Sequence, residues 1–226
     1  MHLMRKQHDA GNLKKGWKNL NITNYKVYDM PDAIVASGLP MMTKYHPLDF
    51  EIEVAKTDAA IRENGSNKHI ERAIRLANAP DGSGHKTFLS GILVAVNITA
   101  TMKWWVQFGR YHFQQIDSSM STMHKLKDMV INNTVKFHPS TNPQVIAEFI
   151  DLVHRTDDIE EIAYSVPAGL ELTARVNTNY LQLRTILVQR MTHSLEEWRD
   201  FCGWILNLPL ADKLIAGGIK NGGSAS

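Results

Sequence analysis

Polar and apolar side chains share one face of a helix that we predict between Asn179 and Arg190. These two residues are eleven positions apart, close to three turns at about 3.6 residues per turn. An uninterrupted helix therefore brings both to the face that also holds Gln182 and Ile186. A guanidinium, a carboxamide and an apolar floor along one line suit a planar heterocyclic ligand with carbonyl edges. A surface helix whose arginine pairs with a carboxylate would use the same residues.

Three other chemical signatures are incomplete in this sequence. The segment 82–87 resembles a phosphate-binding loop, but His85 stands where a glycine should precede the lysine, and a strand-like segment follows where a helix is required. The ten histidines form no HExxH motif and no cluster with cysteine at metal spacing, so no metal site is predicted. Cys202 lies on an amphipathic segment and is predicted to be a small buried side chain rather than a nucleophile.

The elements that must position these residues follow from hydrophobic spacing and from loop residues. The spacing predicts a possible strand at 88–99 and an extended segment at 167–176. Residues 22–45 are predicted as short extended pieces broken by prolines. Helices are predicted at 50–64, 67–79, 101–110, 121–132 and 143–155, the last with Val145, Phe149, Ile150 and Val153 inward. The final helix is predicted to open with a capping box at Ser194-Leu-Glu-Glu197 and to carry Trp198, Phe201, Trp204 and Ile205.

The composition fits one α+β domain. The chain has 226 residues, of which 43% are hydrophobic, and a net charge of +2, which alone does not argue for nucleic-acid binding. The single cysteine excludes an internal disulfide, and no apolar run is long enough for a membrane span or a signal core, so we expect a cytoplasmic protein. We expect a basic, loosely ordered segment at 1–20, one domain at 21–220 and a flexible tail at 221–226.

Four segments carry a family resemblance through their order and spacing. They are His85-Lys-Thr-Phe88, Gln107-Phe-Gly-Arg-Tyr-His112, Pro167 and the helix from Asn179 to Arg190. The second segment begins twenty-two positions after the first, and Asn179 follows Pro167 by twelve. Over residues 85–200 this arrangement resembles the flavin-dependent thymidylate synthases, which work without a catalytic cysteine.

The chain departs from the family's long signature, R-H-R-x-x-S-x-N-E-x-S-x-R-Y, which would begin at Arg110. His112 stands at the second arginine and Thr122 at a later one, while Ala163 stands where the family has an arginine before the proline. In the family the arginines at the positions of Thr122 and Ala163, together with a serine, help to hold the substrate phosphate through strong charge-assisted bonds. Either nearby hydroxyls and Lys125 replace them or the substrate carries its charge elsewhere; the hydroxyls belong to Ser118, Ser119, Ser121 and Thr122.

The resemblance implies a role for each matched residue. Arg190 and Gln107 would contact the pyrimidine as catalytic residues, with Arg190 donating to the ring carbonyls as negative charge grows there. The serines Ser118, Ser119 and Ser121 would contribute to substrate binding. The flavin would be contacted by His85, Arg110, His112, Asp117 and Asn179. Without the resemblance, His85 could simply cap a loop and Arg110 could be part of a structural ion pair.

The resemblance further implies a fold of the thymidylate synthase-complementing type, in which a mainly antiparallel sheet is packed by long helices. The domain at 21–220 would then be catalytic and would form a homotetramer with active sites between subunits. It would use FAD, a folate donor and NADPH to transfer a one-carbon unit to C5 of dUMP or a similar pyrimidine nucleotide. A related hydroxymethylase of altered substrate is the first alternative, in which water rather than hydride ends the reaction.

A non-catalytic basic protein that binds nucleic acid is the second alternative. Its support is a cluster of cations around Trp17, formed by Arg5, Lys6, Lys14, Lys15 and Lys18. A solvated basic tail explains the same residues more simply. We therefore expect a pyrimidine deoxynucleotide, rather than nucleic acid or a membrane, as the partner.

Overall fold

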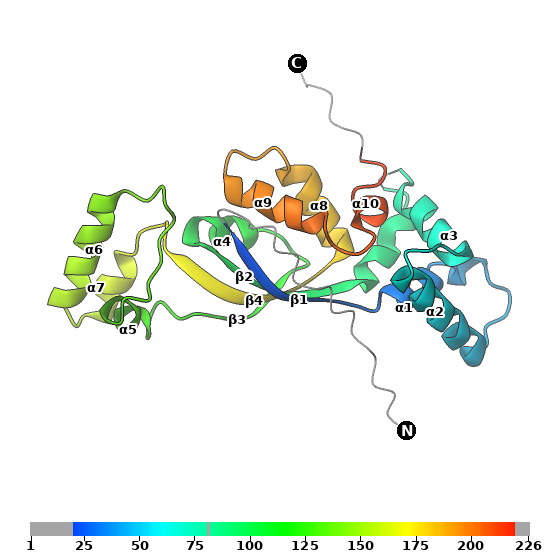
Figure 1. The fold of residues 1–226 in the computed structure, drawn as a ribbon, viewed down its shortest axis with the longest axis horizontal. Coiled ribbons are helices and arrows are strands. Elements are labelled where there is room, and N and C mark those ends of the chain that lie inside the picture. The colour runs from blue at the N-terminus through cyan, green and yellow to red at the C-terminus, as the bar shows by residue number, and fades with distance from the viewer. Residues whose placement is uncertain (1–19, 81, 220–226) are drawn as a thin grey trace, which may run out of the picture.

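A four-stranded antiparallel sheet forms the centre of the molecule (Figure 1). The structure, a computed structural model, describes residues 20–80 and 82–219. The strand order is β1-β2-β4-β3, with β1 at Asn21–Tyr28, β2 at Leu93–Thr101, β3 at Gln115–Ser119 and β4 at Glu171–Asn179. β2 and β4 are the two central strands, and each pairs with its neighbours in antiparallel register. The predicted α+β class with an antiparallel sheet is confirmed.

One face of the sheet is apolar and covered, and the other is polar. On β2 the alternation Val94, Val96 and Ile98 is buried, as the sequence pattern predicts for a half-buried strand. On the polar face Arg175 of β4 donates to Asn97 Oδ1 at 3.0 Å, on the neighbouring strand. The helices α4 (Met102–Phe108), α8 (Tyr180–Arg190) and α9 (Glu196–Ile205) lie over the apolar face (Figure 1).

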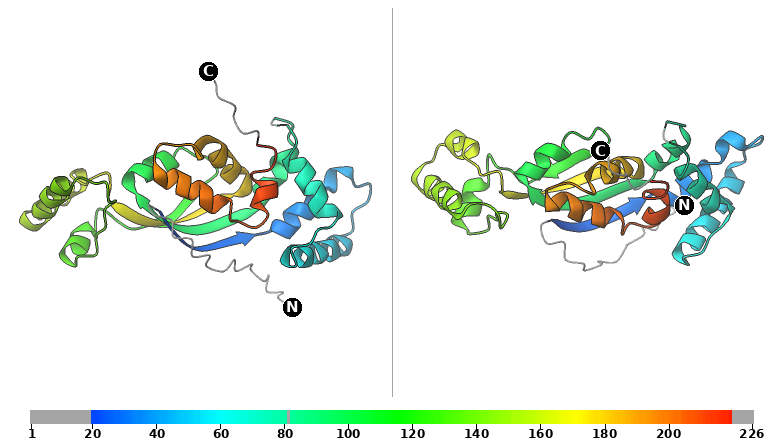
Figure 2. Two further views of the ribbon diagram at one scale, coloured as in Figure 1. Left: turned by 45° about the horizontal axis from the view of Figure 1, so that its top comes forward. Right: turned by 90° about the horizontal axis from the view of Figure 1, so that it is seen from above.

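Two groups of helices extend the molecule at opposite ends of the sheet, as Figure 2 shows from two further directions. The N-terminal lobe comprises α1 (Met30–Ala36), the 3₁₀ helix η1 (Leu39–Met41), α2 (Pro47–Arg62) and α3 (Lys68–Ala77). The distal lobe comprises α5 (Leu126–Ile131), α6 (Pro143–Arg155) and α7 (Ile159–Tyr164). The 3₁₀ helix η2 (His85–Gly91) leads into β2, and α10 (Ala211–Leu214) packs near α3.

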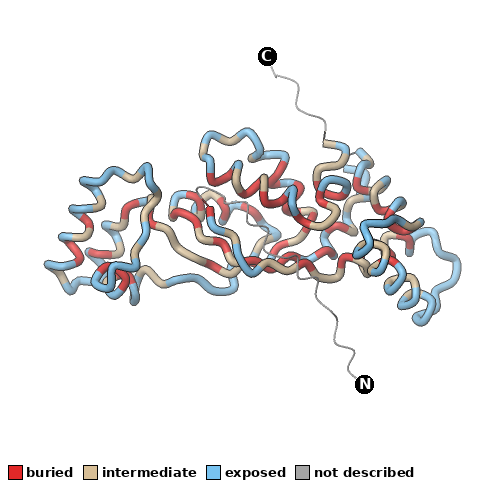
Figure 3. The backbone as a smooth tube through the Cα atoms, viewed as in Figure 1, coloured by how far each residue is buried: buried red, intermediate tan, exposed pale blue. Residues whose placement is uncertain are grey.

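The buried residues form two separate clusters (Figure 3). The main core joins the sheet, the central helices and the N-terminal lobe, and its largest fully buried side chains include Trp104, Trp198 and Tyr180. The distal lobe has its own small core, made of Leu126, Val130, Phe149, Val153, Ile162 and Leu170. The distal lobe is therefore a unit with its own apolar contacts.

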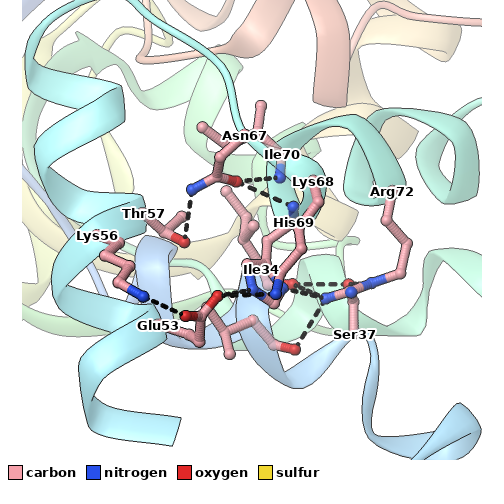
Figure 4. A network of polar contacts seen from close by, with 11 residues as sticks. Ile34, Ser37, Glu53, Lys56, Thr57, Asn67, Lys68, His69, Ile70 and Arg72 are labelled. Carbon is pink, nitrogen blue, oxygen red and sulfur yellow. Dashed lines mark hydrogen bonds and ion pairs between the residues drawn. The ribbon is translucent and has the colours of Figure 1, made fainter. Parts of the chain in front are cut away.

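A chain of polar contacts holds α1, α2 and α3 together in the N-terminal lobe (Figure 4). His69 on α3 is buried, with Glu53 Oε2 2.7 Å from its Nε2 and Arg72 Nη2 3.0 Å from its Nδ1. Because a guanidinium can only donate, Nδ1 accepts and the ring proton lies on Nε2, facing Glu53. Hydrogen bonds from Lys56, His69 and Lys68 lower the pKa of Glu53 to about 2. Arg72 also donates to the Ile34 and Val35 carbonyls at the end of α1.

Three predicted elements differ from the structure. Residues 30–36 form a helix rather than an extended piece, since Pro31 lies in its first turn, where proline is tolerated. Residues 88–91 belong to η2, so β2 begins only at Leu93. Within the predicted helix 121–132, only Leu126–Ile131 is helical.

The predicted capping box at Ser194 is wrong. Leu195 is the N-cap of α9 and makes no side-chain cap, because Glu197 points into the core instead of back along its own helix. The aromatic face that this helix was predicted to carry is buried as expected. On α6 Phe149 and Val153 are buried as predicted, but Val145 is 44% exposed.

Both predicted terminal segments lie almost entirely outside the described residues. This applies to residues 1–19 with their basic cluster and to the tail at 221–226. Leu20, which the prediction included in the loosely ordered segment, is buried in the main core. Among the helices of residues 20–80 and 82–219, none has the length and hydropathy needed to cross a membrane.

Candidate functional site

The helix predicted from Asn179 to Arg190 is present and follows β4 without a loop. Asn179 is the last residue of β4 and the N-cap of α8, where its Oδ1 accepts from the Gln182 backbone N–H at 2.9 Å. Gln182 and Ile186 are buried, and the Gln182 side-chain oxygen accepts from the Phe113 backbone N–H at 3.2 Å. The predicted stripe therefore faces the protein interior along most of its length, and Arg190 at its end reaches a partly exposed position.

Arg190 is held by two aromatic residues. Its Nε donates to the Tyr111 hydroxyl at 2.8 Å, and its guanidinium carbon lies 4.8 Å from the centroid of the Trp198 ring. The Trp198 indole N–H in turn donates to the Gln107 side-chain oxygen at 2.7 Å. Among the described residues no group accepts a hydrogen bond from the two terminal Nη nitrogens of Arg190, so they remain available to a ligand.

Arg190 lines a pocket of about 550 Å³. It brings three predicted site residues together, since Arg110 and His112 line it with Arg190 although they are far apart in the sequence. Its other lining residues are Tyr111, Phe113, Leu181, Gln182, Thr185 and Gln189. The pocket therefore combines two permanent cations and amide groups with aromatic and aliphatic surface, a lining suited to a planar ligand with carbonyl or acidic groups.

The other predicted site residues lie outside this pocket in the single chain. Asn179 caps the opposite end of α8, about 16 Å from Arg190 at 1.5 Å of rise per residue. His85 begins η2 and is exposed. On the exposed strand β3, Asp117 accepts from the Asn177 carboxamide at 2.6 Å, and Ser118 and Ser119 follow it. Ser121 accepts from the His124 backbone N–H at 3.2 Å.

Two buried ionisable groups, Glu197 and Cys202, lie on α9 and do not line this pocket. Burial raises the pKa of the Cys202 thiol to about 12 despite the nearby charge of Arg190, so the thiol stays protonated and the predicted structural role of Cys202 agrees with its burial. Glu197 accepts from the Thr101 backbone N–H at 3.0 Å and from its hydroxyl at 2.9 Å. Burial raises the pKa of Glu197, and the hydrogen bonds from Thr101 oppose that rise.

The sequence reasoning missed the roles of Tyr111 and Trp198. Trp198 was predicted only as one of the residues of the final helix, and Tyr111 was given no role. Most buried indole N–H groups find a hydrogen-bond partner, although those of Trp104 and Trp204 have none among the described residues, so this signal for Trp198 is a weak one. Its partner Gln107 is ninety-one positions away, and no spacing rule connects the two. In the described ranges there is no cluster of three or more His, Cys, Asp or Glu side chains that could hold a metal ion.

Two solved structures share this arrangement of elements. One is a flavin-dependent thymidylate synthase from Helicobacter pylori complexed with FAD and dUMP, which superposes with a TM-score of 0.59 at 14% identity and covers 87% of this chain and 97% of that chain. The chain has the fold of a flavin-dependent thymidylate synthase. A second structure of this enzyme from H. pylori, also with FAD and dUMP, gives a TM-score of 0.56 at 13% identity, over 87% of this chain and 96% of that one. No protein-family model matches the sequence, and no curated protein matches it either.

Proposed function

We propose that this protein is a flavin-dependent thymidylate synthase, which transfers a one-carbon unit from a folate donor to C5 of dUMP. One observation carries the proposal within a fold shared with such enzymes: Arg190 lines a pocket together with Arg110 and His112, and among the described residues its two Nη groups have no hydrogen-bond acceptor. An arginine without a carboxylate partner in the described chain, held by aromatic rings beside an open pocket, is suited to binding a ligand rather than to stabilising the fold.

Arg190 would act on the pyrimidine through its two terminal nitrogens. Each nitrogen carries two N–H groups, and the planar group can donate in parallel to neighbouring acceptors on a ring edge. When a nucleophile or a hydride adds to the ring and prepares C5 to attack the one-carbon unit, negative charge grows on the ring carbonyl oxygens, and fixed donors stabilise that charge. Because Tyr111 and Trp198 already fix the guanidinium, little reorganisation is needed when the substrate binds.

The pocket residues fit a flavin. An isoalloxazine ring needs flat apolar surface and donors at its edges, and its pyrophosphate needs cations. Phe113 and Leu181 supply apolar surface, while Arg110, His112 and Gln189 supply donors. When bound, the flavin would supply two-electron redox chemistry, with NADPH as the source of electrons. The chain's own residues would bind and orient the flavin and the nucleotide and would exclude water from them.

We further propose a homotetramer with sites between subunits. In one chain His85, Asp117 and the serines of the β3 region lie apart from Arg190, although the family resemblance assigns all of them to one site. Contact between copies would bring such residues together. At the phosphate end the exposed hydroxyls of Ser118 and Ser119 are available, whereas the Lys125 ammonium already pairs with Asp128 at 2.9 Å.

Replacing Arg190 with alanine tests the proposal. The purified protein should take up FAD with absorbance near ~450 nm. Arg190→Ala should retain FAD but bind dUMP about a hundredfold more weakly, since hydrogen bonds to charged groups contribute about 1.5–3 kcal/mol each. Calorimetric titration of the FAD-loaded protein measures both affinities. Arg62→Ala is the matched control, because Arg62 pairs with Asp58 in the N-terminal lobe and does not line the pocket.

Failure to take up FAD, or unchanged dUMP affinity in Arg190→Ala, would contradict the proposal. Titration with dCMP alongside dUMP tests the substrate. The mass of the product tests the reaction: a methyl group supports the synthase, and a hydroxymethyl group would instead assign the hydroxymethylase alternative.

A further inference from the structure

Arg190 is restrained at two points of its side chain. A free arginine carries about 2 kcal/mol of rotamer entropy, and Arg190 is the last residue of α8, where the helix itself restricts it least. The bond from Nε to Tyr111 Oη fixes one edge of the guanidinium, and the ring of Trp198 lies against it. Only the Nη edge is left without a contact in the part of the chain that the structure describes.

Trp198 is a rigid support for this arginine. Its ring is fully buried and packs against Trp104 at 4.9 Å and Tyr111 at 5.9 Å between ring centroids. Its indole N–H is fixed by Gln107 of α4. A cation at 4.8 Å from an indole centroid is attracted by the negative face of the ring. Residues of α4, α8, α9 and the segment after α4 therefore converge on one guanidinium.

The surroundings of Arg190 leave its charge available. No ion pair joins it to a carboxylate in the described ranges. The nearby His193 side chain is neutral or positively charged, so it cannot form an ion pair with the guanidinium. Burial, together with the charges of Arg190 and Arg199, lowers the pKa of His193. A hydroxyl and two ring faces hold the guanidinium without neutralising it.

Gln107 is committed to Trp198 and does not line the pocket. We propose that Tyr111 and Trp198 are positioning residues that hold the Nη edge of Arg190 toward the nucleotide, and that Gln107 acts through Trp198 instead of touching the pyrimidine. This inference rests on the proposed role of Arg190. It replaces the direct substrate contact that the family resemblance implies for Gln107.

Conservative variants test the positioning role. Tyr111→Phe removes the acceptor of the Nε bond, and Trp198→Phe removes the indole while keeping an aromatic ring. Each variant should raise the Kd and the KM for dUMP about 5- to 30-fold, while the affinity for FAD stays unchanged. The fall in kcat should be smaller than the rise in KM, because a less restrained arginine makes the same contacts with the substrate but is less often in position to make them. Trp105→Phe is the matched control, since it also removes an indole N–H bond, to the Leu172 carbonyl, in the same aromatic cluster.

A double-mutant cycle tests the role of Gln107. Gln107→Leu alone should weaken dUMP binding as Trp198→Phe does, and adding it to Trp198→Phe should cause no further loss, because the phenylalanine has no N–H to hold. Additive losses would overturn the role assigned to Gln107 and indicate a direct contact with the substrate.

The outcomes separate this inference from the proposed function. If Arg190→Ala binds dUMP normally, the proposed function fails. If Arg190→Ala loses dUMP while Tyr111→Phe and Trp198→Phe behave like Trp105→Phe, only the positioning inference fails. Thermal unfolding and FAD titration of every variant identify losses of dUMP binding that come from a damaged fold, since a structural defect would lower both the unfolding temperature and the FAD affinity.

Discussion

Glu197 places a carboxylate between α9 and the start of α4. Its two oxygens accept from the backbone N–H and the hydroxyl of Thr101. Thr101 is itself the N-cap of α4, because its hydroxyl also accepts from the Trp104 N–H at 3.1 Å. A single buried side chain thus joins the helix that carries Trp198 to the helix that carries Gln107.

Stability should depend on pH through Glu197. Burial raises its pKa in the folded state above the ordinary value of 4.5, so the stability that this group contributes is complete below that value and is lost as pH rises through the raised pKa. Glu197→Gln cannot ionise. The free energy of unfolding of Glu197→Gln minus that of the wild type should therefore increase from about pH 4 to about pH 7.

Urea unfolding at both pH values measures this difference. Glu196→Gln is the control, because Glu196 is the neighbouring residue on α9 and its side chain is 63% exposed. A difference that does not change with pH would show that the carboxyl group of Glu197 titrates as it does in the unfolded chain.

Residue-level properties were predictable where burial alone decides them. Cys202 is buried, as expected for a small apolar side chain on an amphipathic helix. Glu197 was misjudged because its local pattern matched a capping box, whereas its true partner Thr101 is ninety-six positions away. When Glu197 is buried, its carboxylate accepts from both donors of Thr101, which would otherwise be buried without a partner. A capping box at the exposed start of α9 would leave them unsatisfied, and no local pattern in the sequence shows this.

At the scale of elements, the junction between β4 and α8 depends on Asn179. Its Oδ1 is used by the cap, while its Nδ2 is the group that could donate to a flavin. Asn179→Ala should lower the free energy of unfolding by about 1 kcal/mol, the usual value of an N-cap. Asn179→Asp should keep the cap and the stability but bind FAD more weakly, since it loses the Nδ2 donor.

Chemical unfolding without FAD and fluorescence titration with FAD measure the two effects separately. Asn142→Ala serves as a reference, because Asn142 caps α6 in the same way and α6 lies far from α8 (Figure 1). An Asn179→Ala variant as stable as the wild type would remove the capping role, and full FAD affinity in Asn179→Asp would remove the flavin contact.

Elements with strong periodicity or clear caps were predicted well. The helix at 143–155 has the predicted bounds because Asn142 caps it and Pro143 opens it. The strand β3 was not predicted, since all five of its residues are exposed and polar groups dominate it. It is a strand because β4 offers an edge to pair with, and this is a tertiary cause that its own residues do not reveal.

At the scale of the whole molecule, the separate core of the distal lobe predicts local unfolding. Phe149 is buried in that core and packs against Phe137 with ring centroids 6.2 Å apart. Phe149→Ala should cost about 3–5 kcal/mol within the lobe. Hydrogen exchange should then become faster in α5, α6 and α7, while the amides of β2 and β4 stay protected.

Hydrogen exchange followed by mass spectrometry resolves these segments. Val145→Ala on the same helix is the control, because this valine is partly exposed and outside the cluster. Equal acceleration in the lobe and in the central sheet would show instead that both unfold as one unit.

The overall architecture was predictable from the family resemblance, and the pocket was not. The predicted antiparallel α+β fold agrees with structures at only 13–14% identity. The pocket joins residues 110–113 to residues 181–190, and the packing of α8 against the segment after α4 decides which side chains meet there. Spacing placed Arg190 correctly on its helix but could not reveal that Trp198 lies beneath it.

The position of the distal lobe within the chain also sets the order of folding during synthesis. β2 pairs with β4 across the lobe, and the hydroxyls of Thr99 and Thr173 meet although they are seventy-four positions apart. A chain leaving the ribosome presents β1, β2 and the whole lobe before β4 exists, so the lobe can form from local contacts while β2 lacks its central partner. Once folded, the lobe shortens the flexible loop that β4 must close to complete the sheet.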